Sequence, residues 1–120
     1  MKLSAAAVCL GFVAALLVPS ITRAQASPQA LRRMADDYYR WRDRNYPVAS
    51  SDQGLHTWDD KLTDYRPAAV QLRRRYVANL LARVKQIPTA RWAKDDRIDW
   101  MLFRAQLENV NFFEIGRAHV

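Results

Sequence analysis

Apolar residues recur at three- and four-residue steps along much of the chain after residue 28, which is the spacing of one face of an α-helix. The first run predicts a helix over about 29–45. This helix ends before Pro47, because proline disfavours helical geometry in the residue that precedes it. Its apolar face comprises Leu31, Met34, Ala35, Tyr38 and Trp41.

A second helix is predicted over about 67–87, between Pro67, which suits the first helical position, and Pro88, which stops the pattern. Residues 48–66 mix turn formers such as Gly54 with large apolar side chains such as Trp58. We therefore expect a structured connector with one helical turn. The apolar stripe of the second helix comprises Ala69, Leu72, Tyr76, Leu80, Val84 and Ile87, widened by Val70, Val77 and Leu81.

The third helix is predicted from Asp95 onward, and it carries two apolar rows where a surface helix needs one. The first row comprises Ile98, Met101, Leu102, Ala105 and Phe112, and the second comprises Trp100, Phe103, Leu107 and Val110. Three helices can cover only part of this surface. We therefore expect an all-α chain that forms the N-terminal helices of a larger helical protein. With Trp100, Phe103 and Phe112 uncovered, the chain alone should be poorly soluble.

Residues 1–24 have the three-part layout of a secretory signal peptide, with Lys2, an apolar run over 3–18, and small residues after Pro19. Cleavage fits after Ala24 or Ala26. The sequence thus predicts a signal peptide helix and a periplasmic or secreted product, with no membrane attachment after cleavage. A retained anchor and lipidation at Cys9 are the alternatives, although the apolar run is shorter than a membrane span.

We interpret the last residues, 115–120, as a segment of different origin from the rest of the chain. Back-translation of Glu114 and the six residues after it gives a string that resembles the start of a short-read sequencing adapter. We therefore expect the native protein sequence in this chain to end at or near Glu114. This leaves 25–114 as an N-terminal helical segment of a larger domain.

The charge and cysteine content narrow the function classes further. The formal charge of +7 falls to +4 without Lys2, Arg23 and Arg117, which is an ordinary surface balance. No nucleic-acid reading motif is present, so we expect no nucleic-acid partner. Cys9 is the single cysteine and leaves with the signal peptide, which excludes a disulfide or a thiolate metal site afterwards.

The candidate chemical residues are few. His56 is the single histidine outside the tail, and one histidine cannot make a zinc site without further ligands. Asp59 and Asp60 lie nearby, yet adjacent residues rarely converge on one ion. We interpret Asp59 and Asp60 as turn and capping residues and His56 as a polar or capping residue. The alternative is that they take part in acid–base catalysis or bind a metal ion. No Ser/His/Asp set or His-Glu-x-x-His segment is apparent.

The arginine triplet and the tryptophans each have a structural interpretation and a ligand-binding one. Consecutive residues on a helix splay by about 100 degrees, so Arg73, Arg74 and Arg75 should form a solvated face, with ion pairs to neighbours such as Asp64, and not an anion site. Core packing is the preferred interpretation for the tryptophans over stacking on sugars or peptides. They are Trp41, Trp58, Trp92 and Trp100.

The order of these features resembles the bacterial family called domain of unknown function 885. The matching blocks are Tyr38-Tyr39-x-Trp41, Tyr46-Pro47-Val48, Gly54-Leu55-His56-x-Trp58-Asp59-Asp60-x-Leu62-x-Asp64, Asp95-Asp96-Arg97-Ile98-Asp99-Trp100 and Leu107-Glu108. The likeness covers about residues 30–114. It implies a large, mostly helical, exported protein that is similar to zinc metallopeptidases and acts on a peptide substrate.

In that family a downstream His-Glu-x-x-Pro-Gly-His segment would supply zinc ligands and a water-activating Glu. No such segment occurs in this sequence. The resemblance therefore implies a catalytically incomplete scaffold here, with no catalytic, cofactor or metal residue of its own, and zinc only in the full-length protein. His56, Asp59 and Asp60 could line the cleft of that protein. The alternative is a small exported helical protein that binds a partner through its third helix.

Overall fold

The computed structural model describes residues 26–116, and every regular element in that range is helical. The predicted all-α class is confirmed. The predicted signal peptide, 1–24, and residues 117–120 of the predicted tail lie outside the described residues. The elements are α1 (Pro28–Asn45), α2 (Pro47–Asp52), the 3₁₀ turn η1 (His56–Trp58), α3 (Pro67–Lys85) and α4 (Lys94–Gly116).

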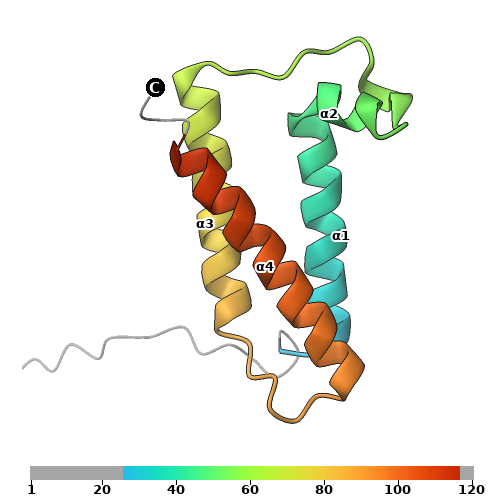
Figure 1. The fold of residues 1–120 in the computed structure, drawn as a ribbon, viewed down its shortest axis with the longest axis vertical. Coiled ribbons are helices and arrows are strands. Elements are labelled where there is room, and N and C mark those ends of the chain that lie inside the picture. The colour runs from blue at the N-terminus through green and yellow to red at the C-terminus, as the bar shows by residue number, and fades with distance from the viewer. Residues whose placement is uncertain (1–25, 117–120) are drawn as a thin grey trace, which may run out of the picture.

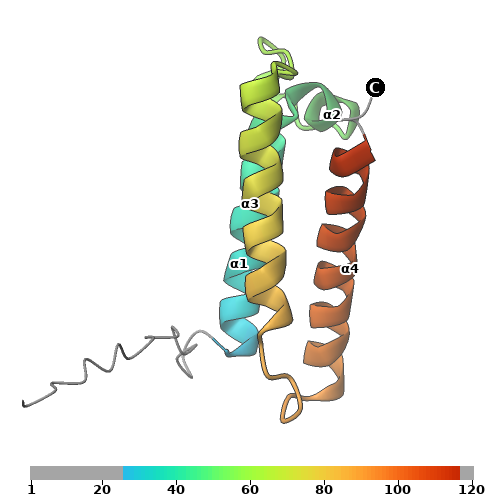
Figure 2. The same ribbon diagram turned by 90° about the vertical axis from the view of Figure 1, so that its left-hand side faces the viewer.

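The long helices α1, α3 and α4 form a bundle in which successive long helices run in opposite directions (Figures 1 and 2). α3 and α4 form a hairpin that holds the most extensive contact in the bundle. α1 packs on this hairpin, closest to α4 near the start of both helices and diverging from it toward their ends. α2 and η1 lie at the end of the bundle where α1 ends, which is also the end where α1 and α4 are farthest apart (Figure 1).

α1 begins and ends where local chemistry requires it. The Ser27 hydroxyl accepts a hydrogen bond from the N–H of Ala30 at 3.1 Å, and Pro28 occupies the first turn, where a missing N–H costs nothing. At the other end the Tyr46 N–H donates to the carbonyl of Arg42 at 2.9 Å. The predicted helix over 29–45 is confirmed to within one residue.

α2 and η1 match the predicted structured connector, which holds two short helical segments where one turn was predicted. Pro47 ends α1, as predicted, and the same residue also starts α2 at its first position. Ser50, which is buried, donates its hydroxyl to the carbonyl of Asp43 at 3.0 Å. This bond fixes α2 across the end of α1.

α2 ends in a Schellman motif built on Gly54. The N–H of Leu55 donates to the carbonyl of Ser50, and the N–H of Gly54 donates to the carbonyl of Ser51, both at 2.9 Å. Gly54 has a φ of +84°. A Cβ built there would meet nothing within 4 Å, so glycine is needed for its backbone conformation and not for space.

α3 and α4 are held together by a side-chain contact near their connection. The indole Nε1 of Trp100 donates to the carbonyl of Val84 at 2.9 Å, in the last turn of α3, where carbonyls lack partners within the helix. α4 starts with Asp95 and Asp96 in its first turn, where carboxylates favour the positive end of the helix dipole. Both predicted helices are therefore confirmed, with α3 ending two residues before the predicted boundary.

The hydrophobic core lies between the three long helices. Tyr38 and Leu107 are fully buried, and Phe103 of α4 meets the Tyr38 ring edge to face at 5.7 Å between centroids. The remaining buried apolar residues of this cluster are Leu31, Val77, Leu80, Leu81, Val84 and Ile87. Leu72, which the sequence analysis placed on the apolar stripe of α3, is exposed.

The two apolar rows of α4 have different environments. The row of Trp100, Phe103, Leu107 and Val110 packs into the bundle. The other row stays exposed: Leu102 is 65% exposed and Phe112 is 72% exposed. The expectation that Trp100 and Phe103 are uncovered is wrong, because α3 and α1 cover them, whereas Phe112 is exposed as expected. Among the described residues, no helix is both long and apolar enough to span a membrane.

Candidate functional site

His56, Asp59 and Ser51 meet at the junction of α2 and η1. His56 Nδ1 lies 3.0 Å from Asp59 Oδ2, and the Ser51 hydroxyl donates to Asp59 Oδ1. The Ser51 hydrogen bond, together with the His56 ring, holds the pKa of Asp59 below its ordinary value. No local sequence pattern marks these residues as a set, because the turn between α2 and η1 brings Ser51 against Asp59 from eight positions away in the chain.

The order of these three groups is wrong for nucleophilic catalysis. In a Ser-His-Asp triad the histidine lies between the other two, so that it can take the serine proton. Here Asp59 lies in the middle, and the side chain of His56 is 71% exposed. The arrangement closes the turn after α2, because Asp59 links the side chain of Ser51 in α2 to that of His56 in η1.

The acidic residues of this segment do not assemble a metal site. Asp60 follows Asp59 in the chain but is exposed and takes no part in the His56 contact. Within residues 26–113, no three His, Cys, Asp or Glu side chains are grouped so that they could hold a metal ion.

Arg73 differs from the predicted solvated face. The three arginines do splay apart, but Arg73 is only 4% exposed. Its Nη1 donates to the main-chain carbonyl of Asp64 at 2.6 Å, while the Asp64 carboxylate binds Arg66. The Arg73 guanidinium also lies over the rings of Tyr46 and Tyr65, 5.0 and 5.8 Å from their centroids. Arg73 thus joins the end of α1, the connector and α3.

Three of the four tryptophans pack against the core, as predicted: Trp41, Trp92 and Trp100. Trp41 stacks on Tyr76 with ring centroids 4.0 Å apart. Trp58 is different, because it lies outside the core in η1 with Lys61 Nζ 4.6 Å from its ring centroid. The core interpretation therefore does not extend to Trp58.

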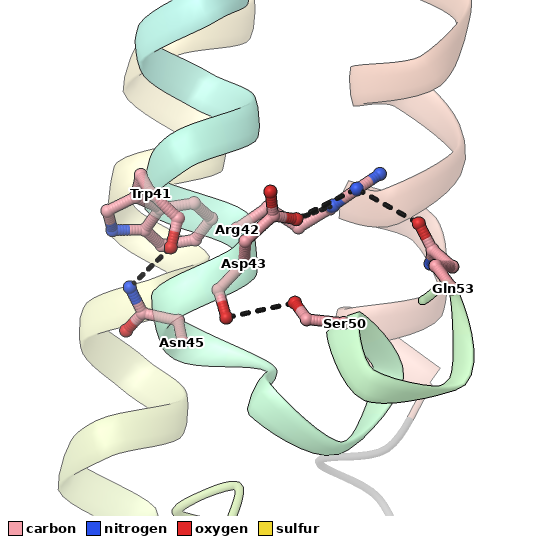
Figure 3. A network of polar contacts seen from close by, with 6 residues as sticks. All are labelled: Trp41, Arg42, Asp43, Asn45, Ser50 and Gln53. Carbon is pink, nitrogen blue, oxygen red and sulfur yellow. Dashed lines mark hydrogen bonds and ion pairs between the residues drawn. The ribbon is translucent and has the colours of Figure 1, made fainter. Parts of the chain in front are cut away.

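A polar network joins the end of α1 to α2 (Figure 3). Arg42 donates from Nε and Nη2 to Asp43 Oδ1 at 3.0 and 2.8 Å, and from Nη2 to Gln53 Oε1 at 3.2 Å. Its guanidinium also lies 4.9 Å from the centroid of the Tyr39 ring. These contacts fix the guanidinium in an orientation that points away from α1 toward α4 (Figure 3).

A cavity of about 300 Å³ lies beside this network, between the ends of α1 and α4, α2 and the connector. Its lining includes Arg42 together with Tyr38, Tyr46, Tyr65, Val110 and Phe113. It brings together residues from four segments of the chain.

The hydroxyl of Tyr38 is buried at this cavity without a hydrogen bond of acceptable geometry. Burial raises the pKa of Tyr38, and the nearby Gln106 side chain and Arg42 offset part of that rise. Sequence reasoning missed this site. One signal was available, since Tyr38 and Arg42 lie four residues apart on one face of α1 and both carry polar tips.

The comparisons with known proteins give no relative on which to base a function. No protein-family model matches the chain, and neither the curated proteins nor the solved structures contain a significant match. The resemblance to the domain of unknown function 885 therefore stays a prediction.

Proposed function

We propose that residues 25–114 form the N-terminal scaffold of an exported, zinc-dependent peptidase-like protein and carry no catalytic group themselves. The observation that carries this proposal is the uncovered apolar row of α4. Ile98, Met101, Leu102 and Phe112 are exposed on a helix whose other apolar row is packed. Contiguous exposed apolar surface of this kind marks a contact with further protein. In this proposal, further helices of the same polypeptide pack on it.

The residues that carry the family resemblance support a scaffold role, because many of them hold the helices in place. Pro47 starts α2, and Gly54 ends it. Asp96 binds Arg32 of α1 at 2.6 Å, and Trp100 binds the end of α3. In this proposal, these residues stabilise the helices that support the active-site cleft of the full-length protein, and they take no part in its chemistry.

Zinc enters the proposal only through the downstream segment that the resemblance implies. The described residues hold no ligand group for it, so no step of peptide hydrolysis is assigned to them. In the full-length protein, a bound zinc ion would activate water for attack on the peptide. Its peptide substrate and its zinc content are properties to be measured on that protein.

A thiol-labelling experiment tests the scaffold role directly. Cys9 is the single cysteine of the chain, so Cys9→Ala combined with Met101→Cys gives one defined thiol on the uncovered row. We expect fast labelling in the 120-residue chain and much slower labelling in the product of the intact gene. Asn79→Cys, at an exposed polar position of α3, is the control for general access.

Equal labelling of Met101→Cys in both proteins would reject the scaffold role and favour the alternative, an exported binding module. Zinc content and peptide hydrolysis of the intact product then test the peptidase assignment. Loss of zinc on mutation of its downstream histidines would support that assignment. A metal-free active product would reject it.

A further inference from the structure

Two buried polar atoms have no hydrogen bond of acceptable geometry, one in the wall of the cavity between α1, α2 and the end of α4, and one behind that wall. Within the described residues, these atoms are Tyr38 Oη and Arg73 Nε. Tyr38 lines the cavity directly. Arg73 lies against the rings of Tyr46 and Tyr65, which form part of the cavity wall. Buried polar groups are nearly always satisfied in folded proteins, so the unpaired Tyr38 hydroxyl in the cavity wall points to a missing partner.

The charges around the cavity favour an anion as that partner. Arg42 and Asp43 form one ion pair at the rim. Arg73 is buried, and no ion pair of the described residues includes it. The neighbouring carboxylate, Asp64, binds the exposed Arg66. Arg73 lies behind the cavity wall, on the rings of Tyr46 and Tyr65, so a positive charge without an ion pair stands close to the cavity and would attract a carboxylate bound there.

The donors at the cavity suit a carboxylate in number as well as charge. Asp43 and Gln53 occupy Nε and Nη2 of Arg42, and no hydrogen bond among the described residues uses Nη1. Arg42 and Tyr38 both line the cavity, and a carboxylate has two oxygens, one for each of these donors.

The remaining lining is aromatic and apolar, from Tyr46, Tyr65, Val110 and Phe113. The volume of about 300 Å³ is at the small end of ligand pockets, about 300–1,000 Å³. It suits one aromatic or branched apolar group attached to the carboxylate.

We propose that this cavity binds the carboxylate of a ligand that carries an aromatic or branched apolar side chain. Arg42 and Tyr38 hold the carboxylate, and the tyrosine and phenylalanine rings enclose the side chain. Both a free acid and the C-terminal residue of a peptide present this chemistry. The binding site is independent of the scaffold role, because it depends only on residues within the described bundle.

The test measures binding of N-acetyl-L-phenylalanine to the full chain by NMR chemical-shift titration, with N-acetyl-L-phenylalaninamide as the probe that lacks the carboxylate. A ligand of this size should bind with a dissociation constant of about 1 mM. The amide should bind at least about tenfold more weakly, since it loses the charge-assisted hydrogen bonds. Equal affinity for the acid and the amide would overturn the proposal.

Paired variants identify the groups that hold the carboxylate. Tyr38→Phe removes an unbonded hydroxyl and keeps the ring, so the fold should be retained while affinity for the acid falls about tenfold. Tyr76→Phe, the same substitution at a tyrosine of α3 outside this cavity, should leave the affinity unchanged. Arg42→Gln should remove the preference for acid over amide. Unchanged affinity in Tyr38→Phe would contradict the assignment even if Arg42→Gln failed to fold.

A further titration separates the two sources of the carboxylate. The peptide Gly-Ala-Ala-Phe with a free C-terminus is compared with N-acetyl-L-phenylalanine, and the amidated peptide is the control. Tighter binding of the free peptide than of the small acid identifies peptide C-termini as the ligand. Equal or weaker binding identifies a free acid. Binding of the amidated peptide as tight as that of the free peptide would again overturn the carboxylate proposal.

Discussion

Two leucines of α4 provide a direct test of how the bundle buries this helix. Leu107 is fully buried, whereas Leu102, five residues earlier in the same helix, is 65% exposed. The same substitution to alanine at both positions removes the same atoms from the same kind of element. The two effects on stability should therefore differ only through the surroundings of each side chain.

The expected magnitudes follow from burial. Truncation of a fully buried leucine loses its transfer free energy and leaves a cavity, at a cost of about 3–5 kcal/mol, so Leu107→Ala should strongly destabilise the bundle. Only roughly a third of Leu102 is buried, and complete burial is worth about 1.5–3 kcal/mol. Leu102→Ala should thus cost about 0.5–1 kcal/mol, and the higher helix propensity of alanine reduces even that.

Thermal unfolding followed by circular dichroism at the helix band measures both variants. A difference of about 2 kcal/mol or more between them corresponds to about 8–16 °C in Tm for a domain of this size. Equal destabilisation by the two variants would refute the arrangement described here, because it would mean that Leu102 is as well covered as Leu107. The same result in the product of the intact gene, but not in this chain, would instead support the scaffold role.

Three further substitutions test individual contacts. Gly54→Ala should lower the free energy of unfolding by about 1 kcal/mol in urea denaturation, because alanine disfavours a positive φ, and an unchanged midpoint would contradict the turn geometry. Trp100→Phe removes the donor to Val84 and should cost about 1–2 kcal/mol by the same assay; full stability would show that this bond does not hold the hairpin. Hydrogen bonds from Arg66 lower the pKa of Asp64 to about 2, so carbon NMR should find its midpoint there, and Arg66→Gln should return it toward the ordinary 3.8. Because the folded pKa lies below the unfolded one, this contact favours folding above about pH 4 and is lost as the pH falls toward 2; a midpoint near 3.8 in the unmodified chain would contradict it.

Local rules predicted the long helices well, because their boundaries depend on residues close in sequence. Pro67 marks the start of α3, and Asp95 lies in the first turn of α4. One helical turn was predicted in the connector, but the start of α2 at Pro47 was not, because Pro47 was assigned only to the end of α1 and it also begins the next helix.

Long-range contacts explain what local patterns did not predict. Periodicity identified both apolar rows of α4 but could not say which one faces α3, since that depends on the direction in which the chain returns. Arg73 is buried because its guanidinium lies over two rings, that of Tyr46, which is far from it in sequence, and that of Tyr65 in the connector. The cavity next to these rings likewise draws its lining from four segments, so no single stretch of sequence indicates it.

The placement of the arginines makes the two ends of the bundle respond differently to salt. Near the starts of α1 and α4, Arg32 pairs with Asp96 and Asp99 while its own side chain is 55% exposed. Dissolved ions screen such a contact, with a Debye length of about 3 Å at 1 M against about 10 Å at 0.1 M. At the opposite end Arg73 is only 4% exposed and is enclosed by rings and a carbonyl, so dissolved salt screens its contacts much less. High ionic strength should therefore loosen α1 at its first turns and leave its junction with the connector intact.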